Sequence, residues 1–454
     1  MTAEYPAPTR SPVTSAIPGT WCCEFELSGE ASVRAVLPVE EVHRLARVLV
    51  RLHGDPLGYL TLPLSAGELG ADALFRAAWE QFGDAVNIHL RREGLAAITL
   101  LTADARPLPA SETCPSRVVA YPCVSVVVCT RDRPQILLGC LTTLQSLTYP
   151  HVEVIIVDNA PSDDSTKRLV DAVVEKDARF RYVLEQRPGL SCARNRGLAA
   201  ARGTYVAYTD DDVSVDDGWI EGVVRGFQRS ANVGCVTGLV CSASITNAEE
   251  AYFDARAASW STRFQRESYE LFGADPGDSF SPYFAGVFGT GANVAFDRVL
   301  LTDLGTFDEA LGAGTRTRGG EDLDMFVRVL LAGRIIAYEP TALVWHRHRA
   351  DHAALLKQMF GYGTGLSAFI TKCLLQTSTR RGLLRALGAG TRRLASIGSS
   401  ATERLGDGVE RPRGALLREL TGIAVGPICY LRAERSARRS QQAGETHPMG
   451  QCTS

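Results

Sequence analysis

The stretch GTYVAYTDDDVSVDDGW, residues 203–219, decides the fold. Residues 204–209 are mainly β-branched and aromatic, without polar alternation, which is typical of a strand buried on both faces. The run ends in three consecutive carboxylates, Asp210, Asp211 and Asp212. Ligands bind at the carboxyl ends of strands in open α/β sheets. Like charges about 4 Å apart repel by roughly 4 kcal/mol near a protein surface, so these acids call for a cation or for one protonated member.

Hard carboxylate oxygens of this kind suit Mg²⁺ or Mn²⁺, which commonly bridge to substrate phosphates. The alternative interpretation is that Asp211 or Asp212 only caps a helix that begins near Asp217. The sequence therefore predicts a divalent cation site, with a helix cap as the structural alternative.

The chain around this stretch alternates between predicted strands and helices, at lengths that suit a parallel sheet. We expect strands at residues 124–129, 152–157, 180–185 and 233–240, and helices at 135–147, 165–176, 190–201 and 218–230. This order predicts an α/β fold with a mixed, mainly parallel sheet flanked by helices.

The whole chain has 454 residues, a net charge of −3 and 45% hydrophobic residues, which gives no signal for nucleic-acid binding. No apolar run approaches the roughly 18 residues of a membrane span, and the N-terminus lacks the apolar core of a signal peptide. The twelve cysteines include no C-x-x-C pair, so we expect no zinc site and a reducing compartment. The expected location is the cytoplasm.

Composition divides the chain into five parts. We expect disorder at residues 1–20, a small α/β unit without a chemical motif at 21–107, and a proline-containing linker at 108–122. Within the small unit, residues 39–53 resemble an amphipathic helix. The main domain spans 123–375, and a basic tail, helical and then disordered, spans 376–454.

The tail has thirteen Lys and Arg against six Asp and Glu from Arg380 onward. Residues 383–394 fit a basic amphipathic helix on an anionic membrane, and they fit equally a solvated helix packed on the rest of the chain. We expect disorder after about Arg435.

Three further groups of polar residues stand at predicted strand ends or helix starts. Asp158, in VDNAPSDD at 157–164, can accept hydrogen bonds from a nucleobase or ribose, although such acids also form turns and caps. Glu321 and Asp322, in GGED at 319–322, suit either a general base or a first helical turn stabilised by the helix dipole. The third group is CTRDRP at 129–134. His346 and His348 are also compatible with surface histidines.

These residues together resemble the family 2 glycosyltransferases, which are nucleotide-sugar-dependent and have the GT-A fold. The resemblance rests on an ordered series of motifs and covers residues 123–375. The motifs are VVVCTRDRP at 126–134, VDN at 157–159, PGLSCARN at 188–195, DDD at 210–212, GED at 320–322 and WH at 345–346.

The resemblance implies roles for individual residues around a bound donor and cation. Asp210 and Asp212 match the outer acids of the D-x-D motif that holds Mn²⁺ or Mg²⁺ against the donor diphosphate, and His346 matches a late histidine that joins the metal. Asp322 matches the catalytic base of an inverting transfer, with Glu321 as the fallback. The implied nucleotide-binding residues are Thr130, Arg131, Asp158, Arg187, Arg194, Asn195 and Asp211. One departure is Asn159, where the family often has a second acid.

The implied partners are a UDP-, GDP- or dTDP-sugar donor and a glycan or lipid-linked acceptor, in bacterial polysaccharide or surface-glycan synthesis. Peripheral contact with the inner face of the plasma membrane through the tail is a further expectation. One alternative function is a catalytically silent sugar-nucleotide-binding or scaffold protein on the same fold. The other is a nucleotidyltransferase, which would normally carry a glycine-rich basic loop after the first strand, whereas this chain has no glycine there until Gly139.

Overall fold

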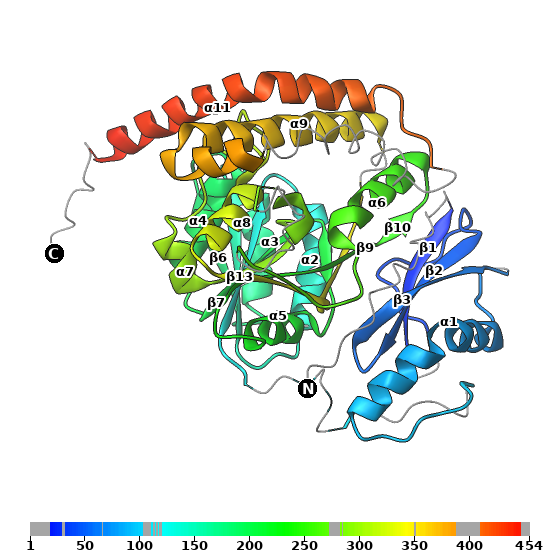
Figure 1. The fold of residues 1–454 in the computed structure, drawn as a ribbon. Helices are drawn as coiled ribbons and strands as arrows, with labels where there is room; N and C mark the ends of the chain where they lie inside the picture. Colours follow the sequence, from blue (N-terminus) through cyan, green and yellow to red (C-terminus); the bar gives the residue numbers. More distant parts are fainter. Residues whose placement is uncertain are drawn as a thin grey trace.

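The computed structural model of the chain consists of two sheets covered by helices (Figure 1). It describes residues 19–29, 32–65, 67–102, 110–111, 114, 117, 120–271, 282–283, 285–348, 351–386 and 409–445. The region from residue 124 to residue 375 is called the main domain below, and the sheet within it the main sheet.

The main sheet has nine strands and both parallel and antiparallel pairs, so the predicted mixed α/β class is confirmed. Strand β4 pairs in parallel with β5 and β7, β5 with β6, and β9 with β13, whereas β12 is antiparallel to both β7 and β9. In spatial order the strands are β11 (Glu267–Tyr269), β13 (Ile335–His346), β9 (Val233–Ser242), β12 (Asn293–Asp297), β7 (Tyr205–Asp210), β4 (Val124–Thr130), β5 (Val152–Asn159) and β6 (Phe180–Glu185), with β8 (Val213–Val215) paired to β13.

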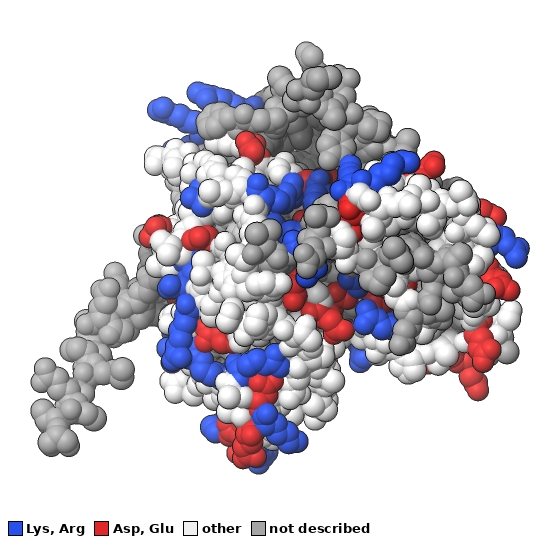
Figure 2. All heavy atoms as spheres, turned by 90° about the horizontal axis from the view of Figure 1, so that it is seen from below, with Lys and Arg blue, Asp and Glu red and all other residues white. Residues whose placement is uncertain are grey.

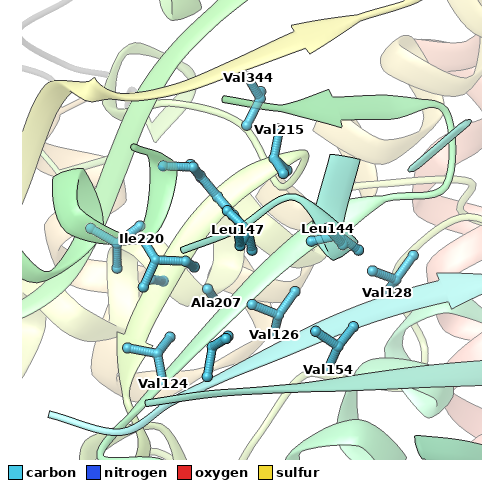
Figure 3. Packing of buried hydrophobic residues seen from close by; sticks show 14 of the residues in the cluster. Val124, Val126, Val128, Leu144, Leu147, Val154, Ala207, Val215, Ile220 and Val344 are labelled. Carbon is cyan, nitrogen blue, oxygen red and sulfur yellow. The ribbon is translucent and has the colours of Figure 1, made fainter. Parts of the chain in front are cut away.

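Helices cover both faces of the main sheet, as the continuous apolar strands predict. Val126 and Val128 of β4 pack with Leu144 and Ile220 on one face (Figure 3), whereas Val127 points into the core on the other face. The helices of the main domain are α2 (Pro134–Gln145), α3 (Ser165–Val174), α4 (Leu190–Ala200), α5 (Trp219–Gln228), α6 (Ala248–Ser261), α7 (Arg298–Asp303), α8 (Glu321–Leu331) and α9 (His352–Leu375), with the 3₁₀ turn η1 (Ala285–Phe288).

The N-terminal part forms a second sheet in the order β10-β1-β2-β3, with helix α1 packed against it. Its strand β10 comes from the main domain, so the two parts share a sheet. Thr20, at the end of the segment expected to be disordered, begins β1, and residues 1–18 lie outside the described residues. The elements are β1 (Thr20–Glu26), β2 (Leu45–Leu52), β3 (Asp55–Pro63), β10 (Ser244–Ile245) and α1 (Ala71–Arg92).

The helix predicted at residues 39–53 is wrong, because Leu45–Leu52 is strand β2, parallel to β1 and antiparallel to β3. Arg47 and Arg51 stand four residues apart and so imitate the polar face of a helix. In the structure both are buried and paired with acids of the main domain. The Arg47 Nη1 atom lies 2.8 Å from Asp254 Oδ1, and Arg51 Nη1 lies 2.6 Å from Asp216 Oδ2.

Helix α11 (Ala415–Glu445) lies along α9 across one side of the molecule (Figure 1). Glycines allow the two backbones to approach: a Cβ atom on Gly363 would lie 2.1 Å from Glu419 O, and one on Gly422 would lie 2.3 Å from Phe360 O. The prediction of disorder after about Arg435 is wrong as far as Glu445, because α11 continues to that residue.

Other expectations for the connecting segments fall partly outside the described residues. The helix predicted at 383–394 is described only to Ala386, within a helical stretch over residues 377–386. In the predicted linker at 108–122, the described residues 110–111, 114, 117 and 120–122 contain no helix or strand. None of the helices that the structure describes combines the length and apolarity that crossing a bilayer requires.

Acidic and basic side chains are interspersed on the face shown in Figure 2, and neither sign covers it. This mixture agrees with the small net charge of −3.

Asp351 is the N-cap of helix α9, and its carboxylate accepts hydrogen bonds from the Ala353 and Ala354 backbone N–H groups. Replacing Asp351 with Ala is expected to lower the free energy of unfolding by about 1 kcal/mol, measured by urea denaturation, because the first turn loses its N-cap. The control is Glu80→Ala, at an exposed position inside α1, where the change should stay within about 0.5 kcal/mol. Equal losses in the two variants would contradict a capping role.

Candidate active site

The three consecutive acids stand where strand β7 ends. Asp210 is the last residue of β7, and Asp211 and Asp212 follow before β8 begins. Asp211 is buried, and it accepts hydrogen bonds from Thr130 Oγ1 at 2.7 Å and Arg133 Nη1 at 2.6 Å. Burial raises the pKa of Asp211 to about 6, although the Arg133 charge opposes this rise. These two bonds connect the loop that carries Asp210 and Asp212 to the end of β4 and to the residue before α2.

Asp210, Asp212 and His346 converge from two strands. Strand β13 runs antiparallel to β8, with His346 paired to Val213, so the imidazole arrives beside the acids. One ligand atom from each of the three residues lies within 4.8 Å of the other two. Two carboxylates and an imidazole form a donor set suited to Mn²⁺ or Mg²⁺.

The ionisation of the two acids fits a site for positive charge. Burial and the neighbouring Asp212 charge raise the pKa of Asp210, while Arg194 opposes the rise. Burial would also raise the pKa of Asp212, but its hydrogen bond to His346 and the charges of His346 and Arg133 bring it below the usual range. A second positive charge near Asp210 would thus relieve an unfavourable ionisation.

A chain of hydrogen bonds sets the orientation of the His346 ring. Ser242 Oγ donates to Asp254, so it accepts from His348 Nε2, which lies 2.6 Å away. Burial holds the pKa of His348 well below its usual value, so its ring is neutral and its Nδ1 is an acceptor. That atom lies 3.0 Å from His346 Nδ1, which must then be the donor. Arg47 closes the chain at Asp254.

A protonated His346 ring can donate from Nε2 to Asp212 Oδ1, 3.3 Å away, and it is this charged form that lowers the pKa of Asp212. A neutral ring with its proton on Nδ1 instead presents the Nε2 lone pair toward Asp212 Oδ1. Two acceptors at this distance require a proton or a cation between them, and the residues present therefore fit a divalent cation. The structure also corrects the alternative that both histidines lie at the surface: His348 is buried, and only 16% of the His346 side chain is exposed.

Replacing His348 with Ala is expected to weaken Mn²⁺ binding about 10- to 100-fold, because partners behind a ligand hold its tautomer and direction. Isothermal titration with Mn²⁺ measures the change, and kcat at saturating Mn²⁺ should largely recover. The matched control is His352→Ala, a histidine on α9 whose side chain is 44% exposed, which should leave Mn²⁺ affinity unchanged. Unaltered affinity in the His348 variant would contradict the proposed orientation.

Glu321 and Asp322 form the first turn of α8, after Gly320 with a φ of 90°. Asp322 is held by backbone groups: its Oδ2 accepts from Gly291 N at 3.1 Å, and its Oδ1 accepts from Leu323 N at 2.9 Å. Glu321 is buried, with Oε1 3.0 Å from Arg194 Nη1. Burial, reinforced by the Asp322 charge, raises the pKa of Glu321 to about 7.

A cavity of about 630 Å³ joins the two groups of acids. Asp210 and His346 line it together with Glu321 and Asp322, so two of the three metal-binding candidates share one space with both base candidates. Helix α9 contributes further lining residues that the sequence analysis did not single out, namely Lys357, Gln358 and Tyr362.

The nucleotide-binding candidates near β4 and β5 lie beside this cavity without lining it. Asp158 is fully buried at the end of β5, where its Oδ2 accepts from Tyr182 Oη at 2.9 Å. Its Oδ1 is buried and has no hydrogen-bond partner among the described residues. Burial raises the pKa of Asp158. Thr130 is committed to Asp211, and Arg131 is exposed with its Nε 3.7 Å from Asp132.

The candidates on α4 and before it divide into two groups. Arg194 lines the cavity and lies between the acids, with Nη2 3.8 Å from Asp210 Oδ1. Arg187 is half exposed and pairs with Glu185 and Glu309. Asn195 bonds the backbone of Phe307 through both its donor and its acceptor. Of these three, only Arg194 is brought to the site.

Asn159, where the family often has a second acid, holds a turn of the backbone through its side chain. Its side-chain oxygen accepts from Gly189 N at 2.9 Å, and its Nδ2 donates to Arg187 O at 2.8 Å. The amide thus holds the turn that starts α4, since a carboxylate could not donate to Arg187 O.

Arg133, Tyr182 and His348 contribute to the site but were given no role from the sequence. Arg133 bonds both Asp211 and Asp212, and it stands inside the CTRDRP motif that was already singled out. The available signal for Arg133 was that three consecutive acids require a positive charge near them in the fold. Tyr182 lies in β6 and meets Asp158 only through strand pairing, which the local sequence does not reveal.

Residues 125–303 match the family model described as Glycosyl transferase family 2. The chain carries a family 2 glycosyltransferase domain. This match includes the three acids and ends before Glu321, Asp322 and His346.

Among curated proteins, the chain is 30% identical over 104 residues to EpsH of Bacillus subtilis, named as a glycosyltransferase; the match covers 23% of this chain and 30% of EpsH. It is 27% identical over 374 residues to the pre-mycofactocin glycosyltransferase of Mycobacterium tuberculosis, covering 79% of this chain and 70% of that protein. Among solved structures, mannosyltransferase PcManGT from Pyrobaculum calidifontis, in complex with GDP-Man and Mn²⁺, is 18% identical, with a TM-score of 0.44, and the match covers 68% of this chain and 88% of that one.

Proposed function

We propose that this family 2 glycosyltransferase is an inverting, metal-dependent enzyme that moves a sugar from a nucleotide-sugar donor to a hydroxyl acceptor. The observation that carries the proposal is one cavity that is lined both by Asp210 and His346 and by Glu321 and Asp322. A site for charge neutralisation and a site for proton removal are thus close enough to serve one substrate.

Asp210, Asp212 and His346 would hold the cation, Mn²⁺ or Mg²⁺. When bound, it supplies Lewis-acid stabilisation of the negative charge on the departing diphosphate. Arg133 and Arg194 contribute fixed positive charge behind the acids, and the hydrogen-bond chain through His348 keeps His346 Nε2 directed toward them.

Asp322 is the proposed base. The acceptor hydroxyl oxygen attacks the anomeric carbon, the bond from that carbon to the diphosphate oxygen breaks, and the electron pair leaves with the diphosphate. The hydroxyl proton passes to the Asp322 carboxylate. Because attack is in line and opposite the leaving group, the anomeric configuration inverts. Glu321 is the fallback base, although its ion pair with Arg194 commits one of its oxygens.

Asp158 is the proposed acceptor for a nucleobase N–H, since its free buried oxygen lies at the end of β5. Thr130, Arg131, Arg187, Asn195 and Asp211 stay predictions as nucleotide contacts, and their visible bonds support the loops around that position. The donor is a UDP-, GDP- or dTDP-sugar.

Two acceptors follow from different observations. A glycan or lipid-linked acceptor in bacterial polysaccharide synthesis follows from the family resemblance. The 374-residue match to the pre-mycofactocin glycosyltransferase extends well beyond the family domain, which makes pre-mycofactocin a second acceptor to test.

The test is a panel of nucleotide sugars with and without Mn²⁺, read by thermal unfolding and by release of free nucleotide. A bound donor should raise the melting temperature only when the metal is present. Nucleoside diphosphate release with acceptor supports transfer. Binding without turnover of any donor would favour the silent sugar-binding alternative, and pyrophosphate chemistry would favour a nucleotidyltransferase.

A further inference from the structure

Four side chains of metal-ligating type converge in the N-terminal part of the chain, outside the cavity described above. They are His53, His89, Glu93 and Cys114, and one ligand atom from each lies within 4.8 Å of the other three. Three different segments supply them. His53 occupies the turn between β2 and β3, His89 and Glu93 stand one turn apart at the end of α1, and Cys114 lies between α1 and β4.

The spacing of the two imidazole nitrogens and the thiol sulfur is close to that of a tetrahedral zinc site, whereas Glu93 Oε1 lies at hydrogen-bond distance from the histidines. With Zn–N bonds of about 2.0–2.1 Å and a Zn–S bond of about 2.3 Å, neighbouring ligands would stand roughly 3.3–3.6 Å apart. His53 Nδ1 and His89 Nε2 are 3.1 Å apart, and the Cys114 Sγ atom lies 3.9 Å and 3.8 Å from them. Three ligand atoms thus already surround one point at nearly the required separations.

Glu93 supplies the fourth ligand atom. Its Oε1 lies 2.7 Å from His89 Nε2 and also contacts His53 Nδ1. Its other oxygen, Oε2, accepts hydrogen bonds from both the backbone N–H and the hydroxyl of Ser111, each at 3.0 Å. The two bonds to Ser111 therefore hold the carboxylate with Oε1 directed at the two imidazoles. Hydrogen-bond partners commonly orient metal ligands in this way.

The surroundings favour a closed structural site. The side chains of His53 and Glu93 have no exposed surface, and that of His89 is 11% exposed. The outer nitrogen of His89 faces another carboxylate, with Nδ1 3.6 Å from Asp55 Oδ2. Four protein ligands leave no open position for a substrate, which distinguishes this site from the cavity around Asp210.

We propose that His53, His89, Glu93 and Cys114 bind one structural Zn²⁺ ion, separate from the cation used in sugar transfer. The ion joins the β2–β3 turn, the end of α1 and the segment that leads into the main domain. The expectation of no zinc site rested on the missing C-x-x-C pair. These ligands include one cysteine and are spread over 62 positions, so that criterion could not detect them.

The first experiment measures zinc in the full chain after expression with Zn²⁺ and dialysis, by inductively coupled plasma mass spectrometry. We expect about one Zn²⁺ per chain, retained when Asp210 and Asp212 are both changed to Asn and lost in Cys114→Ser and His89→Gln. The matched control is Cys123→Ser, an exposed cysteine in the same connecting segment, which should keep its zinc.

The second experiment replaces zinc by Co²⁺, whose bond to a thiolate gives a charge-transfer band in the near ultraviolet. The band should appear in the wild-type and Cys123→Ser proteins and be absent in Cys114→Ser. If the Cys114 variant fails to fold, the wild-type chain alone decides: a strong chelator should lower its melting temperature, and Zn²⁺ should restore it. A wild-type protein without bound zinc and without a chelator effect would overturn the proposal and leave a hydrogen-bonded cluster.

Discussion

Changing Asp210 and Asp212 together to asparagine is expected to lower Mn²⁺-supported sugar transfer at least about 1000-fold, equivalent to roughly 4 kcal/mol of transition-state stabilisation. Asparagine keeps the size of aspartate and removes its charge, so the change removes the two anionic ligands of the proposed cation. Initial rates over a range of Mn²⁺ concentrations measure the effect. Isothermal titration should show no Mn²⁺ binding at concentrations that saturate the wild-type protein.

The single variants separate ligand loss from structural damage. Because the pKa of Asp210 is raised and its side chain is 38% exposed, its neutral replacement should change the melting temperature little, while Mn²⁺ affinity still falls. Asp212 has a lowered pKa and pairs with Arg133 and His346, so Asp212→Asn should also cost stability. The matched control is Asp217→Asn, nearby with a side chain 57% exposed. Full Mn²⁺-dependent turnover by the double variant would refute the proposed metal site.

The main sheet was predictable because its strands are buried on both faces, and a strand of this kind is a run of consecutive apolar residues that the sequence shows directly. The run that ends at Asp210 is β7, and the apolar run before Thr130 is β4. The small unit was less predictable. Arg47 and Arg51 are polar residues at helical spacing, and their acidic partners make them suitable for a buried strand: Asp254 for Arg47, and Asp216 together with Glu24 of β1 for Arg51.

In the candidate site, too, local motifs were predictable from the sequence and tertiary contacts were not. Asp210, Asp212 and His346 were proposed together from motif order, and the structure brings them within reach of one ion. The roles of the groups behind them depend on tertiary contacts. His348 becomes an acceptor because Ser242 and Asp254, more than ninety residues earlier, fix which of its nitrogens carries the proton. No pattern in the sequence around His348 indicates which of its nitrogens carries the proton.

The two acids at the start of α8 should respond differently to neutral replacement. Asp322→Asn is expected to reduce kcat by about 100- to 10,000-fold, the usual contribution of a general base, with Mn²⁺ affinity unchanged. Asp322 accepts from Gly291 N through Oδ2 and from Leu323 N through Oδ1, so the amide can keep one of these two bonds through its single oxygen, and it loses the ability to accept the proton. The control is Asp303→Asn, at an exposed position in α7.

Glu321→Gln should instead act through the metal site and through pH. With a pKa of about 7, Glu321 is ionised above that pH and protonated below it. When it is protonated, Arg194 loses its partner at 3.0 Å and is left to pair with Asp210, 3.8 Å away, in competition with the cation. Wild-type Mn²⁺ affinity should therefore rise as the pH increases through about 7.

The Glu321→Gln variant should show weak Mn²⁺ binding without that rise, since its side chain is neutral at every pH. At saturating Mn²⁺ its kcat should stay within about tenfold of the wild-type value, while that of Asp322→Asn stays low. The opposite pattern, with turnover abolished by Glu321→Gln and retained by Asp322→Asn, would assign the base to Glu321. Because the two residues share one helical turn and one cavity, only this split between metal affinity and kcat can distinguish a group that accepts the proton from one that holds Arg194 away from Asp210.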